Sequence, residues 1–135
     1  MDIGRNAVGM AVSDEQRQVV FGRGVIRNYK SLAHLFSEIK SFCTKENVEL
    51  VVLGLPAGKE GEDTPQTERI RSIGEKLEEY LEGIPVEFED ESFTTFEANE
   101  FLGGVAGVKG RKKKETEDEI AAVIILKRYL DFDES

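Results

Sequence analysis

The run VELVVLG at residues 48–54 constrains the fold of this chain more than any other stretch. It is short, almost continuously apolar and rich in valine, which is typical of a strand that is buried on both faces. Amphipathic patterns flank it, because Leu35 and Ile39 recur at a step of four before it and Ile73 and Leu77 do so after it. A buried strand between two such helices predicts an α/β domain with a sheet between helices.

Further signals complete this architecture. Residues 7–13 and 18–26 flank the turn-like segment SDEQR and predict an antiparallel hairpin, and residues 85–90 predict a later strand. Helices are predicted over residues 30–47, from Thr64 and Pro65, from Thr94 with Glu97 in a capping box, and from Thr116 with Glu119 in the same role. Their predicted buried faces include Tyr80, Ile120, Val123, Ile124, Tyr129 and Leu130. The order of these strands and helices along the chain predicts one domain over residues 1–135. Its mixed sheet is expected to open with antiparallel strands and to continue with parallel strands.

Charge is unevenly distributed along the chain. The net charge is −9, yet the segment KGRKKK at residues 109–114 is almost entirely basic. An acidic protein with one basic segment either binds a polyanion at that segment or exposes a solvated loop there. Three glycines precede the basic run and periodicity is weak, so residues 103–115 are predicted to form a mobile loop.

Several classes of protein are disfavoured. No apolar run approaches the roughly 18 residues that span a bilayer, and no secretory signal opens the chain. We therefore expect a cytoplasmic protein with no membrane partner. Cys43 lies on an apolar helical face and is expected in the core, whereas His34 lies off that face and is not expected to be catalytic.

Three carboxylates stand at the ends of predicted elements. Asp2 precedes a glycine turn, Glu91 follows the strand at 85–90, and Asp118 lies in the first turn of the last helix. If these ends gather at one edge of the sheet, the carboxylates supply the oxygen ligands that Mg²⁺ prefers, and two such ions hydrolyse phosphodiesters. Acids at helix starts and on acidic surfaces also occur for stability alone. Spacing therefore leaves both interpretations open.

Four ordered motifs carry a resemblance to a known family. They are DIGRNAVGMAVSD, VVLGLP, DESFTT and DEIAAVIILKRYLD, and together they resemble the YqgF/RuvX family of the ribonuclease H-like superfamily. The resemblance implies a five-stranded mixed sheet with helices on both faces. It also implies a hydrolase: a nuclease that uses two Mg²⁺ or Mn²⁺ ions with substrate bound and matures the 5′ end of 16S ribosomal RNA. An older interpretation of the family is Holliday junction resolvase.

The resemblance also implies a site. Its catalytic and metal-binding acids fall on Asp2, Glu91 and Asp118, and its loop after the buried strand falls on residues 54–56. The implied substrate-binding residues are Gly4, Arg5, Gly9, Lys109, Arg111, Lys112, Lys113 and Lys114. The expected partners are pre-16S rRNA or branched DNA and ribosomal particles, and the protein is expected to be a monomer or a weak homodimer.

The chain departs from this family in two ways. Relatives usually carry arginines where this chain has Ala7 and Ser92, and Arg5 is a partial substitute for the first. Relatives also carry several apolar residues before the aspartate, whereas only Met1 precedes Asp2 here. We therefore expect a shortened first strand, either because the gene product begins upstream or because the sheet has a gap. A free amino group beside Asp2 is expected to weaken metal binding.

Three functions remain open. The first is a metal-dependent nuclease, and the second is a non-catalytic nucleic-acid-binding or ribosome-associated module that keeps the fold and the basic segment. The missing arginines favour the module, and the three acids favour the nuclease. A sugar-kinase or actin-like ATPase shares the Asp-x-Gly pattern, but such enzymes bind nucleotide between two domains and this chain has the length of one. Magnesium binding would separate the first two.

Overall fold

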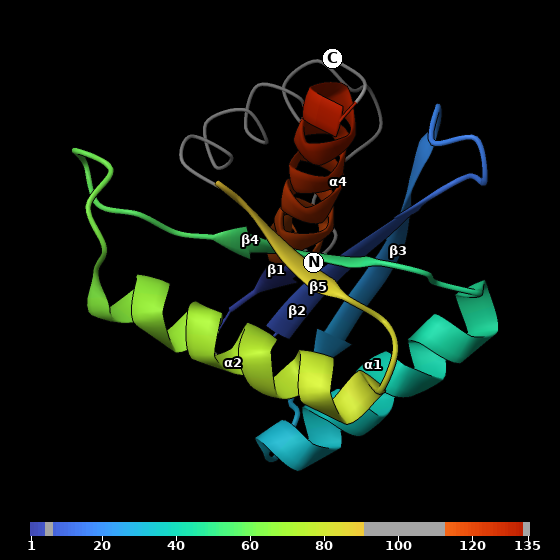
Figure 1. Cartoon of the computed structure of the whole chain (residues 1–135), viewed down its shortest axis with the longest axis horizontal. Coiled ribbons are helices and arrows are strands. Elements are labelled where there is room, and N and C mark those ends of the chain that lie inside the picture. Colours follow the sequence, from blue (N-terminus) through green and yellow to red (C-terminus); the bar gives the residue numbers. More distant parts are fainter. Residues whose placement is uncertain (5–6, 91–112, 134–135) are drawn as a thin grey trace.

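The computed structural model describes residues 1–4, 7–90 and 113–133, with the side chains of the last helix described over residues 117–131. Helices α1 and α2 lie on one side of the strands and α4 lies on the other (Figure 1). In chain order the described elements are β1 (Asp2–Ile3), β2 (Ala7–Ser13), β3 (Val20–Arg27), α1 (Leu32–Glu46), β4 (Val51–Leu55), α2 (Pro65–Leu81), β5 (Val86–Asp90) and α4 (Lys113–Asp133). The predicted helix at Thr94 and the predicted site residues Arg5, Glu91, Lys109, Arg111 and Lys112 lie outside the described residues.

The strands form an antiparallel sheet of β1, β2 and β3 and a parallel pair of β4 and β5. This confirms the predicted mixed α/β architecture, but the described strands are divided between two sheets. Met1 links the two. Its α-amino group donates to the carbonyl of Val52 at 2.6 Å, and the N–H of Gly54 donates to the Met1 carbonyl at 2.9 Å. β1 itself spans two residues, so the first strand is as short as expected.

The turn of the predicted hairpin is held by Asp14. Its carboxylate accepts hydrogen bonds from the backbone N–H groups of Gln18 at 2.7 Å and Val19 at 3.1 Å. These bonds favour the charged form, so they lower the pKa of Asp14. The side chain therefore replaces a regular two-residue turn, and β2 and β3 pair on either side of it.

Helices α1 and α2 both begin directly after a capping residue. The Ser31 hydroxyl accepts from the backbone N–H of His34, and α1 ends at Asn47, whose left-handed φ is 56°. Thr64 caps α2 directly before Pro65, as predicted, and shares a capping box with Thr67. These local signals are readable in sequence because each bonds backbone groups within one turn.

The main core lies between the strands and the first two helices. It contains the predicted helical stripes and the predicted buried strand, and Cys43 is buried as expected. Burial raises the pKa of the Cys43 thiol. The expectation for Tyr80 is wrong, because this residue is 39% exposed and its ring packs against Phe36 at the edge of the core.

Helix α4 covers the opposite face with two alanines and three larger apolar residues. Its buried residues are Ile120, Ala121, Ala122, Ile125 and Leu130. The predicted Val123, Ile124 and Tyr129 are only half-buried, because the side of the helix that meets the strands is the one that carries the alanines. Among the described residues, no helix combines the length and apolarity needed to cross a membrane.

Candidate active site

Asp2, the first predicted carboxylate, lies in β1 and is half-buried. β1 runs antiparallel to β2, and the register places Asp2 opposite Gly9. Directly opposed residues of antiparallel strands have Cα atoms about 4.5–5.5 Å apart, so these two residues are immediate neighbours. A group that contacts Gly9 therefore also lies beside Asp2.

Asp118 of α4 is what packs on Gly9. A Cβ atom added at Gly9 would lie 2.0 Å from the backbone oxygen of Asp118, so no other residue fits at position 9 unless the helix moves. The absence of a side chain lets the helix backbone rest directly on the strand. The structure thus brings Asp118 to the strand pair that carries Asp2. Contact of Gly9 with a substrate stays a prediction.

Glu119 fastens the same turn of α4 to the neighbouring strand. Its Oε2 atom accepts a hydrogen bond from the backbone N–H of Gly24 at 2.6 Å. A Cβ atom at Gly22 would lie 2.6 Å from that oxygen, so Gly22 leaves the room that the carboxylate occupies. The backbone of Gly24 has a φ of +82°, a conformation that favours glycine. Sequence reasoning missed this role of Glu119.

The predicted start of the last helix is wrong. α4 begins at Lys113 rather than Thr116, so Thr116 lies inside the helix and does not cap it with Glu119. Lysine and glutamate are good helix formers, which is why the helix extends back into the basic segment. Lys113 and Lys114 therefore belong to the first turn of α4.

The third predicted carboxylate, Glu91, lies outside the described residues. β5 ends at the preceding residue, Asp90, after pairing in parallel with β4. Within residues 1–4, 7–90 and 113–133 no group of three or more His, Cys, Asp and Glu side chains is placed to hold a metal ion. The three-carboxylate site remains a prediction that depends on Glu91.

Glu89 is a carboxylate that sequence analysis treated as ordinary. Burial raises its pKa, an effect that the guanidinium of Arg128 opposes and the charge of Asp90 reinforces. Arg128 belongs to α4, which also contacts β5. The end of β5 therefore carries a carboxylate with a raised pKa two residues before Glu91, the third predicted metal ligand. No local pattern in the sequence reveals this, because the burial that raises the pKa depends on how distant elements pack.

Gly4, two residues after Asp2, is held by two hydrogen bonds. The N–H of Gly4 donates to the carbonyl of Ala7 at 2.8 Å, and the Tyr29 hydroxyl donates to the carbonyl of Gly4 at 3.0 Å. Ala7 stands where relatives were expected to carry arginine. His34 is exposed and pairs with Glu38 at 3.5 Å, as its place off the apolar stripe predicts.

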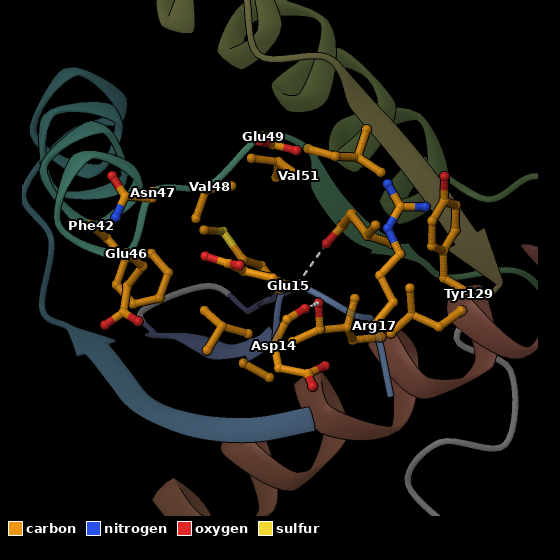
Figure 2. Close-up of a pocket in the computed structure, with 18 residues that line it drawn as sticks. Asp14, Glu15, Arg17, Phe42, Glu46, Asn47, Val48, Glu49, Val51 and Tyr129 are labelled. Carbon is orange, nitrogen blue, oxygen red and sulfur yellow. Dashed lines mark hydrogen bonds between the residues drawn. The ribbon is translucent and has the colours of Figure 1, made fainter. Parts of the chain in front are cut away.

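A cavity of about 520 Å³ is shown in Figure 2, and Asp2, Glu89 and Asp118 are not among the residues that line it. Its walls come from the start of the chain, the ends of β2 and α1, and the last turns of α4. Its charged side chains are Asp14, Glu15, Glu46 and Glu49 against a single guanidinium, that of Arg17. A lining with this charge repels nucleic acid, so the cavity is not the candidate site.

The fold and these contacts define a class of protein: an α/β domain in which the first strand, which carries Asp2, pairs with a strand on which the last helix packs through the backbone of Asp118. The chain belongs to the RuvX family, whose model is described as Holliday junction resolvase and matches residues 1–132. This confirms the resemblance drawn from the four motifs.

Two relatives extend the comparison. One from Caldanaerobacter subterraneus subsp. tengcongensis is 42% identical over 132 residues, which cover 97% of this chain and 93% of the relative. One from Streptococcus pneumoniae serotype 19F is 34% identical over 132 residues, which cover 97% of this chain and 94% of the relative. Both bear the name "Putative pre-16S rRNA nuclease".

Proposed function

We propose that this chain is a metal-dependent nuclease that matures the 5′ end of pre-16S rRNA. Membership of the RuvX family and the names of two relatives support nucleic acid as the substrate. The single observation that carries the proposal is the contact of Asp118 with Gly9, the residue opposite Asp2. It brings together two segments of backbone whose aspartates are 116 positions apart in sequence.

The carboxylates fit the proposed metal. Mg²⁺ is commonly held by one or two carboxylates, with waters and substrate phosphates completing its shell. Asp2 and Asp118 supply two such groups, and Glu91 is the proposed third. Bound Mg²⁺ or Mn²⁺ supplies Lewis acidity for phosphodiester hydrolysis.

The residues of the chain have separate proposed roles. Asp2 is held by the pairing of β1 with β2, and Asp118 is held by the seat of α4 on Gly9. The basic residues at 109–114 are proposed to neutralise substrate phosphates. We further infer that the five strands act as one sheet, because the two hydrogen bonds at Met1 have the pattern of a parallel ladder. We propose that the protein works in the cytoplasm as a monomer or weak homodimer that meets its RNA on ribosomal particles.

The test combines metal titration with cleavage. Isothermal titration of Mg²⁺ and Mn²⁺ into the wild type, Asp2→Asn and Asp118→Asn should show at least about tenfold weaker binding in both variants, the scale typical of altered metal surroundings. Asp131→Asn is the matched control, because Asp131 is an exposed acid on the same helix, about 20 Å further along. Cleavage of an RNA with the 16S precursor junction should follow the same ranking.

The alternative function makes the opposite prediction. A non-catalytic ribosome-associated module, which the alanine at position 7 favours, would bind no metal, and its affinity for RNA would be the same in the wild type and in Asp118→Asn. Cleavage of a four-way DNA junction in preference to RNA would instead support the resolvase interpretation. Unchanged metal affinity in both aspartate variants would overturn the nuclease proposal.

A further inference from the structure

A second recess, distinct from the acidic cavity, lies between α2 and the segment that joins β3 to α1. Its volume is about 460 Å³. We call it the α2 cleft. The residues that line it are Tyr29, Lys30, Ser31, Leu32, Arg69, Ser72, Ile73 and Lys76. No acid is among them, whereas three are cationic and three carry hydroxyl groups.

The charge of the α2 cleft is unusual for this protein. Lys30, Arg69 and Lys76 meet there in a chain whose net charge is −9. Like charges repel, so three cations without a lining carboxylate are unfavourable unless an anion joins them. The charge of its lining therefore favours anions in the cleft, whereas the acidic lining of the larger cavity does not.

Arg69 gives independent support. Its Nη1 atom is buried and has no hydrogen-bond partner among the described residues. A buried donor of a charged group that lacks an acceptor is costly, and few such groups occur in folded proteins. Arg71, two residues further on, is different: its Nη1 atom donates to Asp63 at 3.1 Å. Arg69 thus has an unused donor at the wall of a basic cleft, and a ligand oxygen would satisfy it.

The α2 cleft is also tied to the strand that carries Asp2. Tyr29, at the rim of the cleft, donates its hydroxyl proton to the carbonyl of Gly4. Gly4 follows Asp2 by two residues, which corresponds to about 6.6 Å along a strand. Tyr29 thus connects the wall of the cleft to the segment that follows Asp2.

We propose that the α2 cleft binds a phosphate group of the nucleic-acid chain, with Arg69 as the central donor and Lys30 and Lys76 as flanking charges. The assignment of the ligand to nucleic acid rests on the proposed function. The inference that the cleft binds a phosphate group is independent of that function. The contact positions the substrate and takes no part in the reaction.

The experiment measures binding to the full chain by fluorescence anisotropy of a short labelled single-stranded RNA, and by calorimetry with inorganic phosphate. Arg69→Met keeps the apolar stem and removes the charge, and Arg71→Met is the matched control on the same helix. Arg69→Met should weaken RNA binding about tenfold or more, as expected for a charged hydrogen bond, and should lower the salt slope by about one. Arg71→Met should change the affinity less than about twofold, as expected for an exposed ion pair. Arg69→Lys should restore part of the loss.

The outcomes separate this inference from the proposed function. If Asp118→Asn abolishes cleavage but not RNA affinity while Arg69→Met weakens affinity, both stand. If inorganic phosphate binds through Arg69 but RNA does not bind the wild type, the ligand is free phosphate and the nucleic-acid assignment is overturned. Equal effects of Arg69→Met and Arg71→Met, or binding of neither RNA nor phosphate, would overturn the cleft as a phosphate site. Circular dichroism of each variant confirms that it is folded.

Discussion

Glu119 and Gly24 are joined by a hydrogen bond of 2.6 Å that spans 95 positions of sequence and connects α4 to β3. Glu119 lies inside α4, so its carboxylate does not cap the start of this helix. It holds the helix turn that contains Asp118 against the antiparallel sheet. The geometry of the candidate site therefore depends on a residue that is not one of its predicted ligands.

Replacing Glu119 tests this dependence. Glu119→Ala removes the acceptor of the Gly24 N–H and should lower the free energy of unfolding by about 1–3 kcal/mol. Glu119→Gln retains an acceptor oxygen and should recover much of the loss. Urea denaturation measures both, with Glu79→Ala on the exposed side of α2 as a control expected to stay within about 0.5 kcal/mol. Equal stability of all three variants would show that the bond contributes nothing.

Gly9 should tolerate no side chain. Gly9→Ala places a methyl group 2.0 Å from the Asp118 oxygen and should cost at least about 3 kcal/mol, at the upper end of overpacking effects. Gly61→Ala separates this clash from backbone strain, since Gly61 has a φ of +81° and open space around it. Its cost should be only about 1–2 kcal/mol. Thermal unfolding of the two variants gives the comparison, and similar melting temperatures would contradict it.

Thr67 should be sensitive to loss of its hydroxyl. The side chain is almost fully buried, donates to the carbonyl of Pro56 at 2.5 Å and accepts from the N–H of Thr64 at 3.0 Å. Thr67→Val leaves both partners unsatisfied and should cost about 1–3 kcal/mol. Thr67→Ser keeps both bonds and should cost about 0.8 kcal/mol for the lost methyl group. Chemical denaturation ranks them, and a valine variant as stable as the serine variant would refute this account.

Glu89 should make stability depend on pH. Its folded-state pKa is raised above the ordinary 4.5, so folding favours the protonated form. Its contribution is fully present below about pH 4.5 and is lost as the pH rises through the folded pKa. Glu89→Gln, which is neutral at every pH, should therefore unfold at a slightly higher temperature than the wild type near neutral pH.

This gain should be small and should vanish in acid. Glu89 is partly solvated, so screening keeps the effect below about 0.5 kcal/mol. Melting curves of the wild type and Glu89→Gln at neutral and at acidic pH test the sign. A larger gain at acidic pH would mean that burial does not raise this pKa.

Much of the fold could be predicted because its signals are local. The stripe through Leu35 and Ile39 and the cap at Thr64 each involve residues within a few turns, and all appear in the structure as predicted. The start of α4 could not be predicted as well. Lys113 fits the end of a basic loop as well as the start of a helix, so the local pattern does not decide between them.

The contacts that build the candidate site are not local. Asp2 and Asp118 could be singled out only by resemblance, and their proximity follows from Gly9, whose role is visible only once α4 is placed on it. The unused donor of Arg69 is likewise a property of burial. Charge and periodicity identify Arg69 as one basic residue among many on an amphipathic helix.

The packing of α4 on β2 has a consequence for folding during protein synthesis. Gly9 leaves the ribosome more than a hundred residues before Asp118 does, and chain growth proceeds at about 5–20 residues per second. For several seconds the growing chain therefore carries the first carboxylate without the last. The contact between Gly9 and Asp118 therefore forms only near the end of synthesis, when both of the segments that make it have left the ribosome.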